Sequence, residues 1–196
     1  MHIGLIGGIG PAATDYYYRG LIAAFAERGH ALELTIAHAD APTLLRNLGA
    51  QAVDAQVAIY TRLTDRLAAG GAECVVVTSI AGHFCIAPFV AQSRLPVLDM
   101  LGELDSAIAR SGHRRLGLLG TETVMASRLY GGIASAELVP PEGESLSAVH
   151  DAYVTMAASG RVSDAQRRVF DNACESLLQR HGVDAIVLGG TDLALV

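Results

Sequence analysis

The sequence predicts an α/β fold made of two similar Rossmann-like halves, each with a parallel β-sheet. Short apolar segments alternate with longer helical segments along the chain, and this order is typical of parallel sheets covered by helices. Most of the apolar segments stop at a glycine or a hydroxyl residue. The order also restarts near residue 99, where LGLLG at 116–120 is similar to IGLIG at 3–7. We therefore expect a first domain at 1–98 and a second at 99–196.

In the first half, glycine, proline and β-branched residues define the expected elements. Pro11 fits the first turn of a helix, where its missing N–H costs little, and Gly70 fits the end of another helix. The run CVVV at 74–77 is typical of a strand that is buried on both faces. We expect helices at 12–28 and 51–67, and strands at 3–6, 32–37, 74–77 and 96–98.

The second half repeats this order of strands and helices. Its expected strands lie at 115–119, 137–139 and 185–188, and its expected helices at 101–110, 124–133 and 163–180. The segment 140–147 begins with two prolines and contains Glu142 and Glu144. We expect a surface loop there.

The composition excludes several classes of protein. Hydrophobic residues make up 51% of the 196 residues and charged residues only 17%, which excludes a disordered chain. The net charge of −6 gives no basic surface for nucleic acid. No apolar run is long enough to span a membrane, and the first residues do not resemble a signal peptide. The three cysteines, an odd number, favour free thiols in the cytoplasm.

Small or hydroxyl residues follow four of the expected strands, and ligands of open α/β sheets bind beyond the carboxyl ends of strands. The four strand ends are Gly7-Gly8, Thr78-Ser79, Gly120-Thr121 and Gly190-Thr191. If the two halves face each other, these ends line one interdomain cleft, which is a common place for a small-molecule site.

The loop at 8–13 fits the pattern G-x-G-x-x-A between a strand and a helix. One interpretation is a dinucleotide site in which Asp40 bonds a ribose, although Asp40 lies beyond the usual spacing. Another is a tight turn without a ligand. We favour a third, in which the free N–H groups beside Gly8 and Gly10 hold an anion such as a carboxylate.

The opening IGLIGGIGPAAT at 3–14 resembles that of the aspartate/glutamate racemase family, and RLGLLGT at 115–121 and SRLY at 127–130 resemble the opening of its second domain. The resemblance covers nearly the whole chain. It implies two α/β domains related by a pseudo-twofold axis, catalysis without a cofactor, and one catalytic cysteine in each domain. The family usually continues with a helix that returns to the first domain, and this segment is expected to be missing after Val196.

Both catalytic cysteines of the family are replaced. The family's first motif, Cys-Asn-Thr-x-His, corresponds to Ser79-Ile80-Ala81-Gly82-His83, and its second, Leu-Gly-Cys-Thr-Glu, to Leu188-Gly189-Gly190-Thr191-Asp192. Racemisation at an α-carbon needs one group that removes the proton and another that returns it. A thiol suits either role, a serine hydroxyl needs a neighbouring base, and glycine has no side chain. Two-thiol racemisation is therefore excluded.

Other groups remain candidates for the lost chemistry. Cys85 lies two residues after His83 and either reaches the site or packs in the core, which is the commoner place for a free cysteine. His83 either activates Ser79 or bonds the backbone. Arg46, in the loop after the second strand, either pairs with a carboxylate or lies on a helix surface. Thr121 either contacts the substrate or caps a helix.

The predicted function is that of a cofactor-independent, racemase-like isomerase acting at the α-carbon of an amino acid or another small carboxylate. Ser79, His83 and Thr191 would surround the reacting carbon, and Gly8, Gly10, Arg46 and Thr121 would bind the carboxylate. One alternative is a binding protein for small carboxylates that has lost catalysis, and another is a dinucleotide-binding enzyme. We expect no metal, nucleic acid or membrane partner. The resemblance also points to a homodimer.

Overall fold

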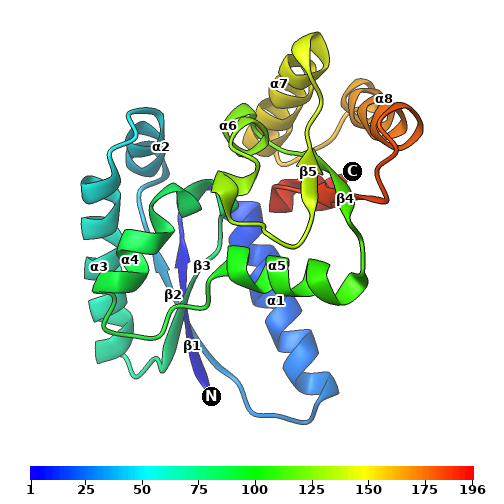
Figure 1. The fold of residues 1–196 in the computed structure, drawn as a ribbon. Helices are drawn as coiled ribbons and strands as arrows, with labels where there is room; N and C mark the ends of the chain where they lie inside the picture. Colours follow the sequence, from blue (N-terminus) through cyan, green and yellow to red (C-terminus); the bar gives the residue numbers. More distant parts are fainter. The chain divides into compact units, whose positions relative to one another are not determined.

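The chain divides into two units, which we describe separately: unit 1 is Met1–Met100 and unit 2 is Leu101–Val196 (Figure 1). The computed structural model describes residues 1–196, apart from the side chains of residues 11 and 158. In this part of the chain, no helix has both the length and the apolar character that crossing a membrane requires.

Unit 1 contains a parallel sheet of three strands in the order β2-β1-β3. The strands are β1 (His2–Gly7), β2 (Glu33–His38) and β3 (Cys74–Val77). The helices are α1 (Pro11–Glu27), α2 (Ala41–Gly49), α3 (Val53–Ala69), the 3₁₀ helix η1 (Ile80–Cys85) and α4 (Ile86–Gln92).

The central strand β1 is buried on both faces, because helices cover the sheet from both sides (Figure 1). Ile3 and Leu5 pack with residues of α1 such as Leu21. Ile6, on the opposite face, packs in the cluster that contains Leu67 of α3. This alternation follows from the period of two along a strand. The α/β prediction is confirmed.

Unit 2 has the same strand order, since its second, first and third strands lie side by side as β5-β4-β6, all parallel. The strands are β4 (Arg115–Leu119), β5 (Glu137–Val139) and β6 (Ala185–Leu188). The helices are α5 (Met100–Ser111), α6 (Glu122–Ala126), η2 (Leu129–Gly131), α7 (Gly143–Ser159), α8 (Asp164–Arg180) and η3 (Thr191–Leu195).

The two units also share a packing detail in their central strands. A Cβ atom on Gly4 of β1 would lie 2.9 Å from a methyl group of Leu67, and one on Gly117 of β4 would lie 3.1 Å from a methyl group of Leu177. Both leucines belong to the long helix that precedes the third strand of their unit, α3 or α8. The glycine in each central strand therefore makes room for that helix, as expected if the two halves are related.

Two expected elements differ from the structure. The strand expected at 96–98 is wrong, because only a single bridge joins Val97 to Val75. The helix expected at 124–133 is also wrong in its length, because α6 ends at Ala126. The following residues Arg128, Leu129 and Tyr130 all have φ between 48° and 57°, which a right-handed helix cannot contain.

Three α-helices were not expected, and one of them is α4, directly after η1. α2 occupies the segment after β2, with Asp40 as its N-cap, so Arg46 lies on a helix and not in a loop. α7 begins at Gly143, within the segment 140–147 that we expected to be a surface loop. α2 and α7 approach the carboxyl ends of the strands, where the candidate site lies.

Candidate functional site

The glycine loop of unit 1 connects β1 to the first turn of α1. Gly8 has a φ of 153° and Gly10, the N-cap of α1, a φ of 72°, so both adopt conformations that favour glycine. In the described residues, α1 has no side-chain cap and no acidic residue in its first turn. Pro11 has no N–H, and the Ala13 N–H donates to the Gly10 carbonyl oxygen at 3.1 Å, so only the remaining N–H groups of the first turn keep their capacity for an external acceptor. The helix dipole favours an anion there.

Hydroxyl groups connect this loop to the end of β3. The Thr78 hydroxyl donates to the carbonyl oxygen of Ile6 at 3.1 Å, and the Thr14 and Thr78 hydroxyl oxygens are 2.9 Å apart. Because the Thr78 proton is engaged with Ile6, Thr14 is the donor in this pair. A Cβ on Gly7 would lie 2.7 Å from the Thr14 hydroxyl, so glycine at position 7 leaves room for the contact.

Ser79 is the first residue after Thr78 and has extended backbone angles. It lines a narrow hollow, too small for a water molecule, together with Gly8, Leu44 and Tyr60. The structure therefore brings Ser79 and the glycine loop of unit 1 to the same hollow at the carboxyl edge of the sheet.

The buried ring of His83 bonds the backbone of Ser79. Its Nδ1 lies 2.7 Å from the Ser79 carbonyl oxygen, which can only accept, so Nδ1 carries a proton and donates it. Nε2 is buried and has no hydrogen-bond partner in the described part of the chain, and the nearest carboxylate oxygen, on Asp99, is 3.9 Å away. Of the two interpretations of His83, the backbone bond is the one that the structure shows.

Acidification is expected to destabilise unit 1 through His83. Burial lowers the pKa of His83, and the Ser79 carbonyl and the Asp99 charge oppose this only in part. As pH falls below about 6.5, the unfolded histidine takes up a proton that the folded one still excludes. The free energy of unfolding then decreases, by at most about 1.4 kcal/mol per pH unit, until the pH reaches the lowered pKa of His83 in the folded protein.

Urea unfolding at pH 7.5 and 5.5 measures this loss. His83→Gln is expected to show a smaller difference between the two pH values than the unchanged protein. His30→Gln, at an exposed histidine, is the matched control and is expected to keep the full difference. Equal differences in all three proteins would contradict a buried neutral His83.

Asp40 and Arg46 both belong to α2. The Asp40 side chain accepts from the Thr43 backbone N–H at 3.0 Å, and the hydroxyl and N–H of Thr43 lower the pKa of Asp40. Asp40 is thus engaged as a helix cap, which argues against a ribose contact. Arg46 is exposed and donates to the Thr43 hydroxyl at 2.8 Å.

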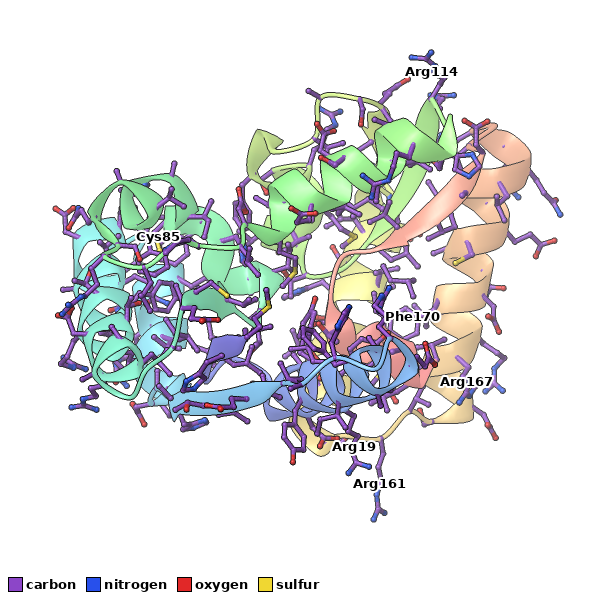
Figure 2. The ribbon with its side chains drawn as sticks, turned by 90° about the horizontal axis from the view of Figure 1, so that it is seen from below. Arg19, Cys85, Arg114, Arg161, Arg167 and Phe170 are labelled. Carbon is purple, nitrogen blue, oxygen red and sulfur yellow. The ribbon has the colours of Figure 1, made fainter. Side chains whose placement is uncertain are left out.

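The three cysteines are free. Cys85 is fully buried inside unit 1 (Figure 2), where its Sγ lies 3.6 Å from the Gly82 carbonyl oxygen. Burial raises its pKa to about 12, and burial also raises the pKa of Cys74 and Cys174. None of these thiols has the environment of a reactive thiolate, and the interpretation of Cys85 as a core residue agrees with the structure.

In unit 2, polar residues follow both β4 and β6. Thr121 is the N-cap of α6 and accepts from the Val124 N–H at 3.4 Å, so the capping interpretation agrees with the structure. Thr191 begins η3, and Gly190 before it has a φ of −171°. Any residue adopts such an extended backbone, so the backbone conformation does not explain the glycine at position 190.

Side chains of α7 contact both of these loops. The ring of His150 accepts from the Glu122 backbone N–H at 3.1 Å. The Tyr153 hydroxyl donates to Asp192 Oδ2 at 3.0 Å, and Asp192 is only 5% exposed. Burial, followed by the Asp192 charge, raises the pKa of Tyr153, so its hydroxyl keeps the proton.

Tyr153 and His150 are therefore residues of the candidate site that sequence reasoning missed. Their i, i+3 spacing would have placed them on one helix face, but the helix itself was not expected.

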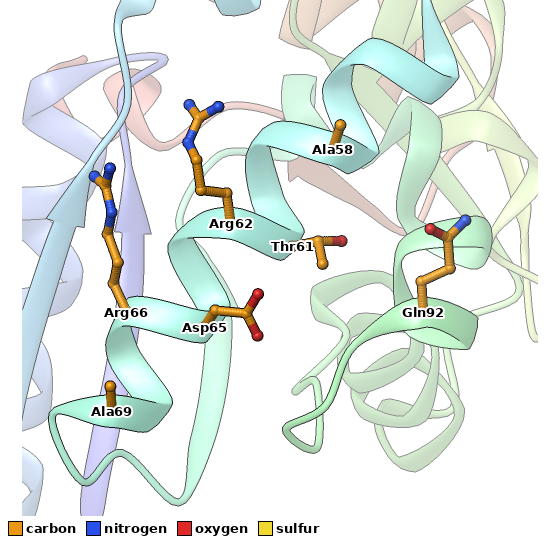
Figure 3. Close-up of a pocket in the computed structure, with 7 residues that line it drawn as sticks. All are labelled: Ala58, Thr61, Arg62, Asp65, Arg66, Ala69 and Gln92. Carbon is orange, nitrogen blue, oxygen red and sulfur yellow. The ribbon is translucent and has the colours of Figure 1, made fainter.

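A wider hollow lies away from the strand ends. It has a volume of about 580 Å³ on the surface of α3 and α4. In Figure 3, Thr61 and Asp65 point from α3 toward Gln92, whereas Arg62 and Arg66 point away. None of the predicted site residues lines this wider hollow. Within the described residues, no three histidine, cysteine or acidic side chains form a group that could hold a metal ion.

Comparisons with known proteins identify relatives. Residues 6–196 match the sequence model of the Asp/Glu/Hydantoin racemase family. An aspartate racemase homologue from Pyrococcus horikoshii OT3 has a similar structure, with a TM-score of 0.81 and 23% identity over 99% of this chain and 87% of that chain.

Two further solved structures are similar. For the aspartate racemase of Picrophilus torridus, the TM-score is 0.73 at 19% identity, over 100% of this chain and 83% of that one. For the glutamate racemase of Campylobacter jejuni, it is 0.63 at 15% identity, over 100% and 74%. At such identities these structures establish the fold alone.

Proposed function

Because the chain belongs to the Asp/Glu/Hydantoin racemase family, we propose that it is a racemase-like isomerase that needs no cofactor. Its substrate is an amino acid or another small carboxylic acid, and the reaction takes place at the α-carbon. The observation that carries this proposal is that Gly8 of the glycine loop and Ser79 line one hollow at the end of the sheet of unit 1.

The glycine loop supports carboxylate binding. Gly8 and Gly10 bring the backbone close to the space in front of α1, and the N–H groups of the first turn that are not already engaged can donate to carboxylate oxygens. Arg46 and Thr121 are further donors in this proposal. Arg46 is an exposed cation whose fork-shaped group suits a carboxylate, and Thr121 belongs to the corresponding strand end of unit 2.

Proton transfer would have to use groups other than thiols. In the proposal, Ser79, His83 and Thr191 surround the reacting carbon. The Ser79 hydroxyl is a weak acid that needs a base, and His83 bonds its carbonyl oxygen. This supports a positioning role for His83, which fixes the turn that presents Ser79.

The same contact favours a second candidate function. His83 holds the backbone of Ser79, and Cys85 is buried with a raised pKa. A protein that binds a small carboxylate without turning it over fits these observations as well.

One experiment separates the two functions. The protein is incubated in deuterated water with aspartate, glutamate and a panel of other amino acids, and loss of the α-proton signal is followed by NMR. Melting temperatures are measured with the same compounds. Exchange supports the isomerase, and a melting shift without exchange supports the binding protein. Neither effect with any compound would contradict both, and a titration with NAD and NADP tests the dinucleotide alternative.

The location and assembly of the protein are part of the proposal. Three free thiols support a reducing compartment such as the cytoplasm. A homodimer is expected from the family, and light scattering on the purified chain measures it.

A further inference from the structure

A buried tyrosine of α3 contacts the turn that follows Ser79. The Tyr60 hydroxyl donates to the carbonyl oxygen of Gly82 at 3.4 Å, and the Gly82 N–H donates to the Ser79 carbonyl oxygen at 3.1 Å. Tyr60 also lines the narrow hollow beside Ser79. It is only 1% exposed, and its ring packs edge to face against Phe89, with the ring centroids 5.3 Å apart. This packing gives the ring a fixed place from which the hydroxyl reaches the turn.

The Tyr60 hydroxyl belongs to a chain of hydrogen bonds that crosses unit 1. The Asn47 amide donates to Gln56 Oε1 at 2.9 Å, and Gln56 Nε2 donates to the Tyr60 hydroxyl oxygen at 2.9 Å. Because Gln56 supplies the proton in that contact, the phenol directs its own proton to the Gly82 carbonyl oxygen, which can only accept. Gln56 is fully buried, so the loss of a partner would leave it unsatisfied. The chain thus joins α2 to η1 through α3.

The close approach of the hydroxyl also explains the glycine at position 82. A Cβ there would lie 2.3 Å from the Tyr60 hydroxyl oxygen but 3.5 Å from the ring carbon that bears it. The first distance is too short for non-bonded atoms, so the hydroxyl and a side chain at position 82 exclude each other. Similarly in unit 2, a Cβ on Gly190 would lie 2.3 Å from the Tyr153 hydroxyl oxygen. In each unit, a tyrosine hydroxyl therefore fits against a glycine that follows the third strand.

We propose that Tyr60 is a positioning residue of the candidate site, which holds the turn after Ser79 through the Gly82 carbonyl and so fixes the backbone that carries the Ser79 hydroxyl. His83 bonds the Ser79 carbonyl oxygen from within η1, whereas Tyr60 ties the same turn to α2 and α3. The effect on a substrate rests on the proposed function, and the hold on the turn does not.

The reactivity of Cys85 tests the hold on the turn without any ligand. Cys85 ends η1 and is fully buried, so a thiol reagent reaches it only when this segment opens. Tyr60→Phe keeps the ring and removes the hydroxyl, and it is expected to raise the modification rate of Cys85 about 3- to 10-fold. Peptide mass spectrometry measures the rate at each thiol.

Two controls accompany this measurement. Cys74 lies in β3 of the same unit and should keep its rate, and Tyr16→Phe, which removes the hydroxyl of an exposed tyrosine, should change neither rate. An equal rise at Cys74 and Cys85 would show that Tyr60 stabilises unit 1 as a whole. That result, or an unchanged rate at Cys85, would overturn the hold on the turn.

A double-mutant cycle tests the contact with Gly82. Gly82→Ala is expected to lower Tm by roughly 2–12 °C in the unchanged protein, because the new Cβ meets the hydroxyl. In the Tyr60→Phe background the hydroxyl is absent, so the same substitution should lower Tm much less. An equal fall in both backgrounds would overturn the contact.

Kinetics test the positioning of Ser79. Exchange of the α-proton is followed with the most active panel compound in the unchanged protein and in Tyr60→Phe. We expect kcat to fall about 10- to 100-fold and KM to change less than about threefold, because the carboxylate donors of the glycine loop remain in place. An unchanged kcat would contradict the positioning role and leave the proposed function intact. If no compound exchanges, the role toward a substrate falls with the proposed function, and the thiol and melting experiments decide whether Tyr60 holds the turn.

Discussion

Gly189→Ala is expected to destabilise unit 2 strongly. A Cβ at position 189 would lie 2.7 Å from the Leu119 carbonyl oxygen and 2.9 Å from methyl groups of Leu118 and Val124. The Leu119 carbonyl cannot turn away, because it accepts from the Gly189 N–H at 2.6 Å. The end of β6 would have to move from β4, at a cost of about 3 kcal/mol. This corresponds to a fall in Tm of roughly 6–12 °C for a chain of this size.

Thermal unfolding followed by circular dichroism measures this effect. Gly20→Ala is the control, because Gly20 lies in α1 with no other atom within 4 Å of the added Cβ. That substitution should raise stability slightly, by roughly 0.5–1 kcal/mol. If Gly189→Ala and Gly20→Ala melted at the same temperature, the close approach of β4 and β6 would be wrong.

The second large effect is expected from Gly8→Ala, which would change both stability and binding. Gly8 has a φ of 153°, and a Cβ there would lie 2.7 Å from Leu44 Cδ1 and 2.9 Å from the Ala39 carbonyl oxygen. The backbone conformation alone costs an alanine of order 1–3 kcal/mol. Relief of the contact would move the glycine loop, so the carboxylate donors at the start of α1 would also be displaced.

Melting curves and titrations with the best-binding panel compound test this prediction. Gly8→Ala should lower Tm and weaken binding by more than tenfold, whereas Gly49→Ala, where no atom lies within 4 Å of the new Cβ, should change neither much. Weaker folding with unchanged Kd would show that the glycine loop is structural and would remove it from the binding site.

Most of the framework was accessible to sequence reasoning, because local patterns determine it. Four strands, at 74–77, 115–119, 137–139 and 185–188, agree residue for residue with β3, β4, β5 and β6. The similarity of IGLIG and LGLLG also reflects a real equivalence, since both segments are central strands with a glycine packed under a helix leucine. Apolar runs between glycines are enough to predict such strands, because these strands are determined by the burial of their side chains.

Two of the missed helices, α2 and α7, show where a local signal was overlooked and where it was too weak. α2 carries an Asp cap and a proline in its first turn, which is a standard start signal that we interpreted as a loop. α7 begins after Glu142, which makes no capping bond, and its Gly143 has a φ of 54°. Without a Ser, Thr, Asp or Asn cap, only tertiary packing indicates the start of this helix.

The candidate site was predictable only at its strand ends. Ser79, Gly8 and Thr121 follow strands, so the topology brings them to the carboxyl edge of their own sheets. Tyr153 was not predictable, because its partner Asp192 is 39 residues away and the contact arises from how α7 crosses the end of β6. The glycine at position 190 indicates space beside the backbone, but no local pattern says which side chain fills it.

The tight fit between the Tyr153 phenol ring and Gly190 also restricts how this chain can evolve. A lineage in which position 190 gained a side chain while the tyrosine remained would pass through a clashing intermediate. A smaller residue at position 153 would have to come first, and that step would leave the Asp192 carboxyl group without its donor. Each single step away from the present pair is therefore unfavourable, so the two positions are expected to change together.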